Sequence, residues 1–104
     1  MSEKEYIERE AAKKVLADDY AYGVENQIIK TVEELSELSQ ALCKILTSKL
    51  TDDNSKIFEN IYEEIADVEI MFEQCKMMFQ CDKEVSAWKH KKIERLKRRL
   101  ENEK

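Results

Sequence analysis

Proline is absent from this chain, and glycine occurs only once, at Gly23. The turns that join β-strands usually require Gly, Pro or Asn, so a sheet protein of 104 residues is a poor fit to this composition. The hydrophobic fraction of 42% argues against a disordered chain, although 39% of the residues are charged. We therefore expect an all-α fold, and the length indicates a single domain over residues 1–104.

The spacing of apolar residues predicts about four helices, over residues 2–17, 24–50, 56–80 and 82–101. Gly23 lies in the first of the expected breaks, and Ser55 and Asp82 are the predicted N-caps of the last two helices. Two long helices joined by a short turn form an antiparallel hairpin. The expected architecture is therefore an antiparallel helical bundle.

The apolar stripes also predict the core. Its expected members are Ile7, Ala11 and Val15 in the first helix, Ile28, Val32, Leu35, Leu42, Cys43 and Ile45 in the second, Ile57, Ile61, Ile65, Val68, Phe72, Cys75 and Met78 in the third, and Val85, Ile93, Leu96 and Leu100 in the fourth. Ile70 and Met77 point away from the stripe of the third helix, which gives that helix a second apolar side. A short chain has little with which to cover it, so we expect a homo-oligomer.

The net charge of -5 gives no general affinity for nucleic acid or for anionic membranes. The charge is unevenly distributed, because residues 89–99 contain seven Lys or Arg and one acid, Glu94. Neither a secretory leader nor a membrane span is found in the sequence, and the three cysteines show no close pairing. A reducing cytoplasm is the expected location.

Two acidic motifs lie on the central helices, an EExxE pattern at residues 33–37 and an ExxD pattern at residues 64–67. Residues three apart share a helix face, so Glu34 pairs with Glu37 and Glu64 with Asp67. Oxygen ligands without His or Cys suit Mg²⁺, or Mn²⁺ in its place. The alternative is a solvated, Glu-rich helix face. A di-iron site is excluded, because it needs Glu-x-x-His motifs and the only histidine, His90, lies outside both patterns.

The fourth predicted helix is basic, and its Lys and Arg side chains lie at or beside the apolar stripe. Such side chains are donors to phosphate oxygens, so the helix is a candidate phosphate clamp. A solvated flank with aliphatic stems packed against the core is the alternative. Trp88 is expected in the core or at an interface. A P-loop and a Rossmann fingerprint are excluded, because one glycine can build neither.

These motifs, in this order, resemble the MazG-like all-α nucleoside triphosphate pyrophosphohydrolases. The resemblance runs from about Tyr22 to Arg99 and rests on Tyr22-Gly23, Gln27, the EExxE motif of Glu33, Glu34 and Glu37, a spacer over 39–63, the ExxD motif of Glu64 and Asp67, and the basic segment Lys92-Ile93-Glu94-Arg95. An alternative register pairs Lys91 with Arg95, because Leu96 stands where some relatives have Asn or Arg.

The resemblance implies hydrolysis of a ribo- or deoxynucleoside triphosphate between the α and β phosphates, and nucleotide house-cleaning as the role. It implies Mg²⁺ ligands at Glu34, Glu37, Glu64 and Asp67, and substrate contacts from Gln27, Lys30, Lys92 and Arg95. Glu37 or Glu33 is the expected general base. Homodimers or homotetramers are the implied assemblies. Two other hypotheses stay open: a non-catalytic oligomerisation module, and a regulatory module that binds nucleotide or metal.

Overall fold

The computed structural model of the chain describes residues 1–17, 20–49 and 53–103, with side chains for 1–10, 23–49 and 53–103. These residues form four α-helices and no strand. The helices are α1 (Glu3–Ala17), α2 (Tyr20–Thr47), α3 (Ser55–Met78) and α4 (Asp82–Asn102). The predicted all-α class is confirmed. None of the described helices is long and apolar enough to cross a membrane.

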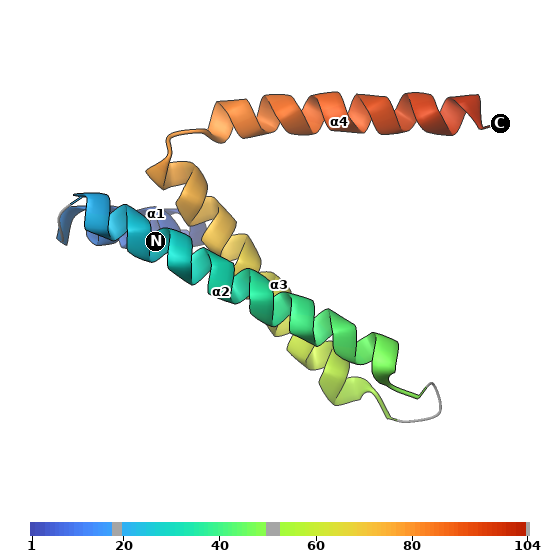
Figure 1. Cartoon of the computed structure of the whole chain (residues 1–104). Helices are drawn as coiled ribbons and strands as arrows, with labels where there is room; N and C mark the ends of the chain where they lie inside the picture. Colours follow the sequence, from blue (N-terminus) through green and yellow to red (C-terminus); the bar gives the residue numbers. More distant parts are fainter. Residues whose placement is uncertain (18–19, 50–52, 104) are drawn as a thin grey trace.

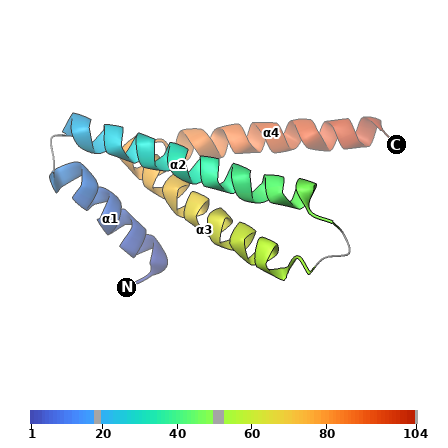
Figure 2. The ribbon, with the colours of Figure 1, turned by 60° about the horizontal axis from the view of Figure 1, so that its bottom comes forward.

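The centre of the molecule is the antiparallel hairpin of α2 and α3 (Figures 1 and 2). α1 packs against both helices of the hairpin, whereas α4 turns away from the end of α3 and projects as a separate rod. Among the described residues, α4 packs against α3 alone. The hairpin therefore holds the carboxylate motifs, and the basic segment lies on the projecting helix.

The helix ends differ from the predicted caps. α3 begins at Ser55 itself, after the N-cap residue Asn54, and the backbone N–H of Ser55 donates to Asp53 Oδ1 at 3.0 Å, which satisfies one of the first N–H groups of the helix. Asp82 is likewise the first residue of α4, where its negative charge favours the helix N-terminus. Between the two helices Gln80 adopts a left-handed φ of 51°, which ends α3 and redirects the chain.

Gly23 was expected to lie in a break, and this prediction is wrong for residues 20–23, which belong to α2. Gly23 is buried, so its missing side chain permits close packing within the bundle. Asp18, Asp19, Thr51 and Asp52 lie outside the described residues, as do the side chains of Ala11, Val15 and Tyr22.

The predicted core stripe of α2 is wrong in part. Ile28, Val32, Leu35 and Leu42 are exposed, and Ile45 is half-buried. The residues that pack fully into the hairpin are Gln27, Glu34 and Ala41 from α2 and Ile61, Val68, Met71, Gln74 and Met78 from α3. On α3, Ile65 and Phe72 are exposed rather than buried. The two helices thus meet along a narrow, mixed polar and apolar seam.

A broad apolar face remains uncovered on one side of the hairpin. At about 100° per residue, the exposed apolar side chains of α2 lie roughly 90° from its seam, and those of α3 lie roughly 120° from theirs in the same rotational sense. Because the helices are antiparallel, both sets point to the same side. The set is Ile28, Val32, Leu35, Leu42 and Leu46 of α2 with Phe58, Tyr62, Ile65 and Phe72 of α3.

Further core predictions are corrected within this single chain. Ile93, Leu96 and Leu100 are exposed, because α4 has no helix of its own chain along that stripe. Val85 is half-buried in the first turn of α4. Cys43 is exposed on α2, and Cys75 is half-buried. Ile70 and Met77 are exposed, as expected for a second apolar side of α3.

Candidate metal centre

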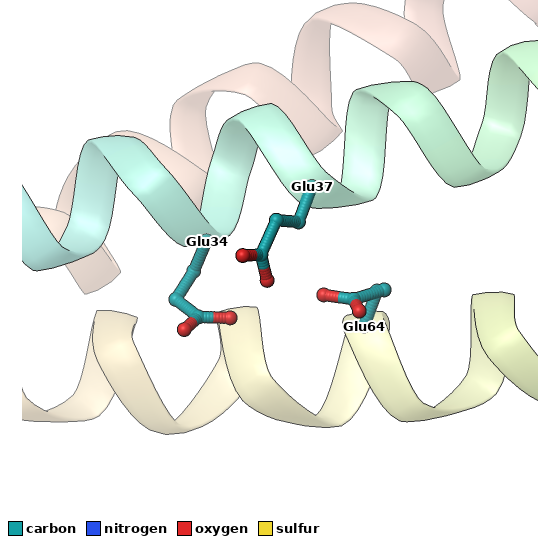
Figure 3. A group of neighbouring side chains, drawn as sticks. All are labelled: Glu34, Glu37 and Glu64. Carbon is teal, nitrogen blue, oxygen red and sulfur yellow. The ribbon is translucent and has the colours of Figure 1, made fainter.

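Three carboxylates from the two predicted acidic motifs meet across the hairpin. Glu34 and Glu37 lie one turn apart on α2, and Glu64 faces them from α3 (Figure 3). One oxygen of each carboxylate can be chosen so that the three lie within 4.8 Å of one another. The antiparallel packing explains this meeting, since i,i+3 spacing places Glu34 and Glu37 together and the seam brings Glu64 alongside.

Glu34 is buried at the seam, with an exposed fraction of 7%. Its Oε1 forms an ion pair with the ammonium of Lys30, whose Nζ lies 3.2 Å away. Its Oε2 is inaccessible and has no hydrogen-bond partner among the described residues, and the same holds for Oε2 of Glu64. Buried carboxylate oxygens without partners are costly. Each of these two side chains thus retains a lone-pair site that a ligand could satisfy.

The negative charges of the cluster lie close enough together to affect one another's ionisation. Burial raises the pKa of the Glu64 carboxyl, and the charges of Glu37, Asp67 and Glu34 raise it further. In contrast, the hydrogen bond and the charge of Glu34 raise the pKa of Lys30, which favours the charged ammonium. Lys30 is the cation nearest to Glu34 among the ion pairs of the described residues. The cluster therefore favours a bound proton or a further cation.

The donor set fits a hard divalent cation. Oxygens that share one Mg²⁺ at about 2.1 Å lie at most about 4.2 Å apart, so only a small side-chain adjustment separates the observed arrangement from coordination. The set contains no nitrogen or sulfur ligand, which favours Mg²⁺ or Mn²⁺ over softer metals. The ligand residues come from two helices packed against each other, which fixes their backbones.

Two other acidic residues of the predicted site lie at its edge. Asp67 is exposed on α3 and falls outside the close group, but its charge contributes to the raised pKa of Glu64. Glu33 is exposed on α2, and its charge contributes to the raised pKa of Lys30. Both predicted roles, metal ligand for Asp67 and base for Glu33, stay predictions.

Gln27 lies deep in the hairpin, two turns before Glu34, with an exposed fraction of 1%. Its Nε2 donates to Gln74 Oε1 at 3.2 Å. Thr31 lies beside the pair, and its hydroxyl donates to the backbone carbonyl of Gln27 at 2.7 Å. The sequence analysis missed Gln74, although its position between the apolar residues Met71 and Met78, on the same side of the helix, was the available indication. The predicted substrate contact by Gln27 is neither supported nor contradicted by this position.

Lys92 and Arg95 are exposed on α4. Because α4 does not pack against α2 within the described part of the chain, the structure does not bring these two side chains to the carboxylates (Figure 1). A single copy thus presents the acidic and basic halves of the predicted site on separate elements.

Comparison with known proteins adds no relative. The chain matches no family model, no curated protein and no solved structure.

Proposed function

We propose that the chain is a MazG-like, Mg²⁺-dependent nucleoside triphosphate pyrophosphohydrolase. The observation that carries the proposal is the carboxylate cluster of Glu34, Glu37 and Glu64, in which two buried oxygens lack partners. The order of motifs, EExxE, ExxD and then a basic helix, supports the same reaction. The substrate is a ribo- or deoxynucleoside triphosphate, and the products are the nucleoside monophosphate and pyrophosphate.

Glu34, Glu37 and Glu64 would hold the cation, with Asp67 as the fourth predicted ligand. When bound, Mg²⁺ or Mn²⁺ supplies neutralisation of the phosphate oxygens and lowers the pKa of a water molecule. The chain itself holds three carboxylates close together on two packed helices. This arrangement limits the reorganisation needed when a triphosphate arrives.

A carboxylate must accept the proton of the attacking water. Glu37 and Glu33 are the candidates, because both are exposed on α2 next to the buried Glu34. Lys30 lies on the same side of α2 as Glu34 and can donate to a phosphate oxygen. Lys92 and Arg95 would bind the phosphates once α4 is brought to the carboxylate cluster. Gln27 would contact the nucleotide.

The proposal includes a homodimer or homotetramer in the cytoplasm that removes unwanted nucleotides. The uncovered apolar face of the hairpin supports self-association, since exposed apolar areas of this kind mark interaction surfaces. Its members come from both helices of the hairpin, so a second copy would bury α2 and α3 together.

The test is pyrophosphate release from a panel of ribo- and deoxynucleoside triphosphates with Mg²⁺ or Mn²⁺. Glu34→Gln and Glu64→Gln should abolish release, because each removes a ligand charge. Glu69→Gln is the matched control, since Glu69 is an exposed acid of the same helix outside the cluster. Release that survives both cluster substitutions, or is absent with every triphosphate, would contradict the enzyme. Metal-dependent nucleotide binding without turnover would favour a regulatory module.

A further inference from the structure

One side of α4 is formed by cations. At about 100° per residue, five basic side chains of the segment 88–99 fall within an arc of about 120°, and the one acid of the segment lies outside that arc. We call this surface the basic face, and its members are Lys91, Lys92, Arg95, Arg98 and Arg99. All five are exposed, and none forms an ion pair with another described residue. The basic face is therefore a strip of uncompensated positive charge along about three turns of helix.

Trp88 lies within the basic face and outside the core of this chain. It is the only tryptophan of the sequence, and 54% of it is exposed. The ammonium of Lys91 lies 5.0 Å from the centroid of its ring. On the helical projection the ring falls between Arg95 and Arg99, and about 80° from Leu96, the nearest exposed apolar side chain of the helix. An exposed aromatic ring therefore stands among cations, apart from the apolar side of α4.

Cations beside an exposed aromatic ring are the combination that binds unpaired nucleotides. Lys and Arg neutralise the phosphates, and a base stacks on the ring. A duplex keeps its bases stacked on one another, so it offers no base to Trp88. In helices that lie on lipid surfaces the Trp belongs to the apolar side, whereas here it lies among the cations. An acidic protein surface would pair with the cations and leave the ring without a role. The arrangement thus favours a single strand.

The net charge of -5 opposes the binding of a polyanion to the chain as a whole, since acids outnumber bases in the hairpin of α2 and α3. α4 projects from the end of the hairpin and does not pack against α2 within the described residues (Figure 1). Arg95, in the middle of the basic face, lies about 20 Å along the helix from its start. The Debye length at physiological ionic strength is about 8 Å, so repulsion from the hairpin is largely screened there.

We propose that the basic face of α4 binds single-stranded nucleic acid. The phosphates lie along the cations of the face, and one unpaired base stacks on Trp88. This binding uses no residue of the carboxylate cluster and needs no divalent cation, so it goes beyond the proposed function. Lys92 and Arg95 belong to both proposals, and the variants that test this one therefore change Arg98 and Arg99 instead.

The single tryptophan makes the wild-type chain its own probe. We expect a single-stranded oligonucleotide, titrated in EDTA, to quench the emission of Trp88 to saturation. A duplex of the same sequence, and heparin as a polyanion without bases, should quench it less. Equal quenching by the oligonucleotide and by heparin or the duplex, or no quenching by any of them, would overturn the proposal. A blue shift with phosphatidylglycerol vesicles, without quenching by the oligonucleotide, would overturn it in favour of a lipid surface.

The salt dependence measures the charge contribution, with a fluorophore-labelled oligonucleotide followed by anisotropy. Five phosphate contacts, at about 0.7 each in the slope of log K against log salt, predict a loss of affinity of about 100-fold between 50 and 200 mM salt. Arg98→Ala/Arg99→Ala should make that slope shallower by about 1.4. Lys83→Ala/Lys97→Ala removes the same charge from outside the basic face and should leave the slope unchanged. Equal slopes for the two double variants would overturn the proposal.

Two further variants test the stacking and separate this inference from the proposed function. Trp88→Ala should lower the affinity for the oligonucleotide at least about fivefold, and an affinity equal to that of the wild type would overturn the proposal. Glu64→Gln should bind the oligonucleotide as the wild type does, because Glu64 lies on α3, outside the basic face. Quenching of the wild type without pyrophosphate release from any triphosphate supports this inference and contradicts the proposed function. Release without quenching does the reverse.

Discussion

Replacing Gln74 by Leu tests the polar contact inside the hairpin. Gln74 and Gln27 are 4% and 1% exposed, and the amide of Gln27 donates to Gln74 Oε1 at 3.2 Å. Loss of this acceptor should cost about 1 kcal/mol, the low end for a buried hydrogen bond, because Gln27 Nε2 keeps its longer contacts with Thr31 Oγ1 at 3.5 Å and Met71 Sδ at 3.6 Å. At about 4–8 °C per kcal/mol for a domain of this size class, Tm should fall measurably.

The double variant Gln27→Leu/Gln74→Leu should recover most of that loss, because two apolar groups of similar size can replace a buried polar pair at little cost. The assay is urea unfolding followed by circular dichroism, analysed as a double-mutant cycle. Gln40→Leu is the control on the exposed side of α2 and should stay within about 0.5 kcal/mol of the wild type. Additive losses in the double variant would refute the reasoning.

The same double variant has a functional consequence. A buried polar pair can specify how two helices align, at some cost in stability. The alignment in which Gln27 contacts Gln74 is also the one that brings Glu64 close to Glu34. We therefore expect the double variant to bind Mg²⁺ more weakly than the wild type in calorimetric titration, even where its free energy of unfolding is restored. Unchanged affinity would show that the apolar contacts alone set the alignment.

Three further predictions concern charge and assembly. Burial raises the pKa of Glu64, so as the pH falls the folded state binds a proton at this carboxyl at a higher pH than the unfolded state does. In the absence of metal, the free energy of unfolding should therefore rise as the pH falls from neutral toward 4.5, the usual pKa of Glu. Urea unfolding at several pH values should show this rise in the wild type and a smaller one in Glu64→Gln. Lys30→Met removes the ammonium 3.2 Å from Glu34 and should tighten Mg²⁺ binding in a titration; weaker binding would contradict competition between the two cations. Leu42→Glu and Phe58→Glu should each lower the mass found by light scattering, and an unchanged mass would exclude their face from the interface.

The sequence predicted the helices well, because their apolar periodicity extends over several turns each. It also predicted which carboxylates share a face, since i,i+3 spacing depends only on helix geometry. The meeting of Glu34, Glu37 and Glu64 followed from the expectation of an antiparallel hairpin. These features depend on the geometry of single helices and on the antiparallel packing of α2 against α3.

The choice of the packed stripe on α2 could not be read from periodicity. Ile28 and Val32 form the more apolar stripe, yet the seam contains Gln27 and Glu34. Apolar periodicity shows which residues of α2 share a side of the helix. It does not show which side of α2 packs against α3 and which side stays exposed. The same reason explains Leu96, because α4 has an apolar row with no helix of its own chain to cover it.

Calorimetric titration with Mg²⁺ tests most directly whether Glu34, Glu37 and Glu64 form a metal site. The account predicts saturable binding to the wild-type chain, loss of that binding in Glu64→Gln, and retention in Glu69→Gln. No saturable binding to the wild type, or equal binding to the two variants, would contradict it.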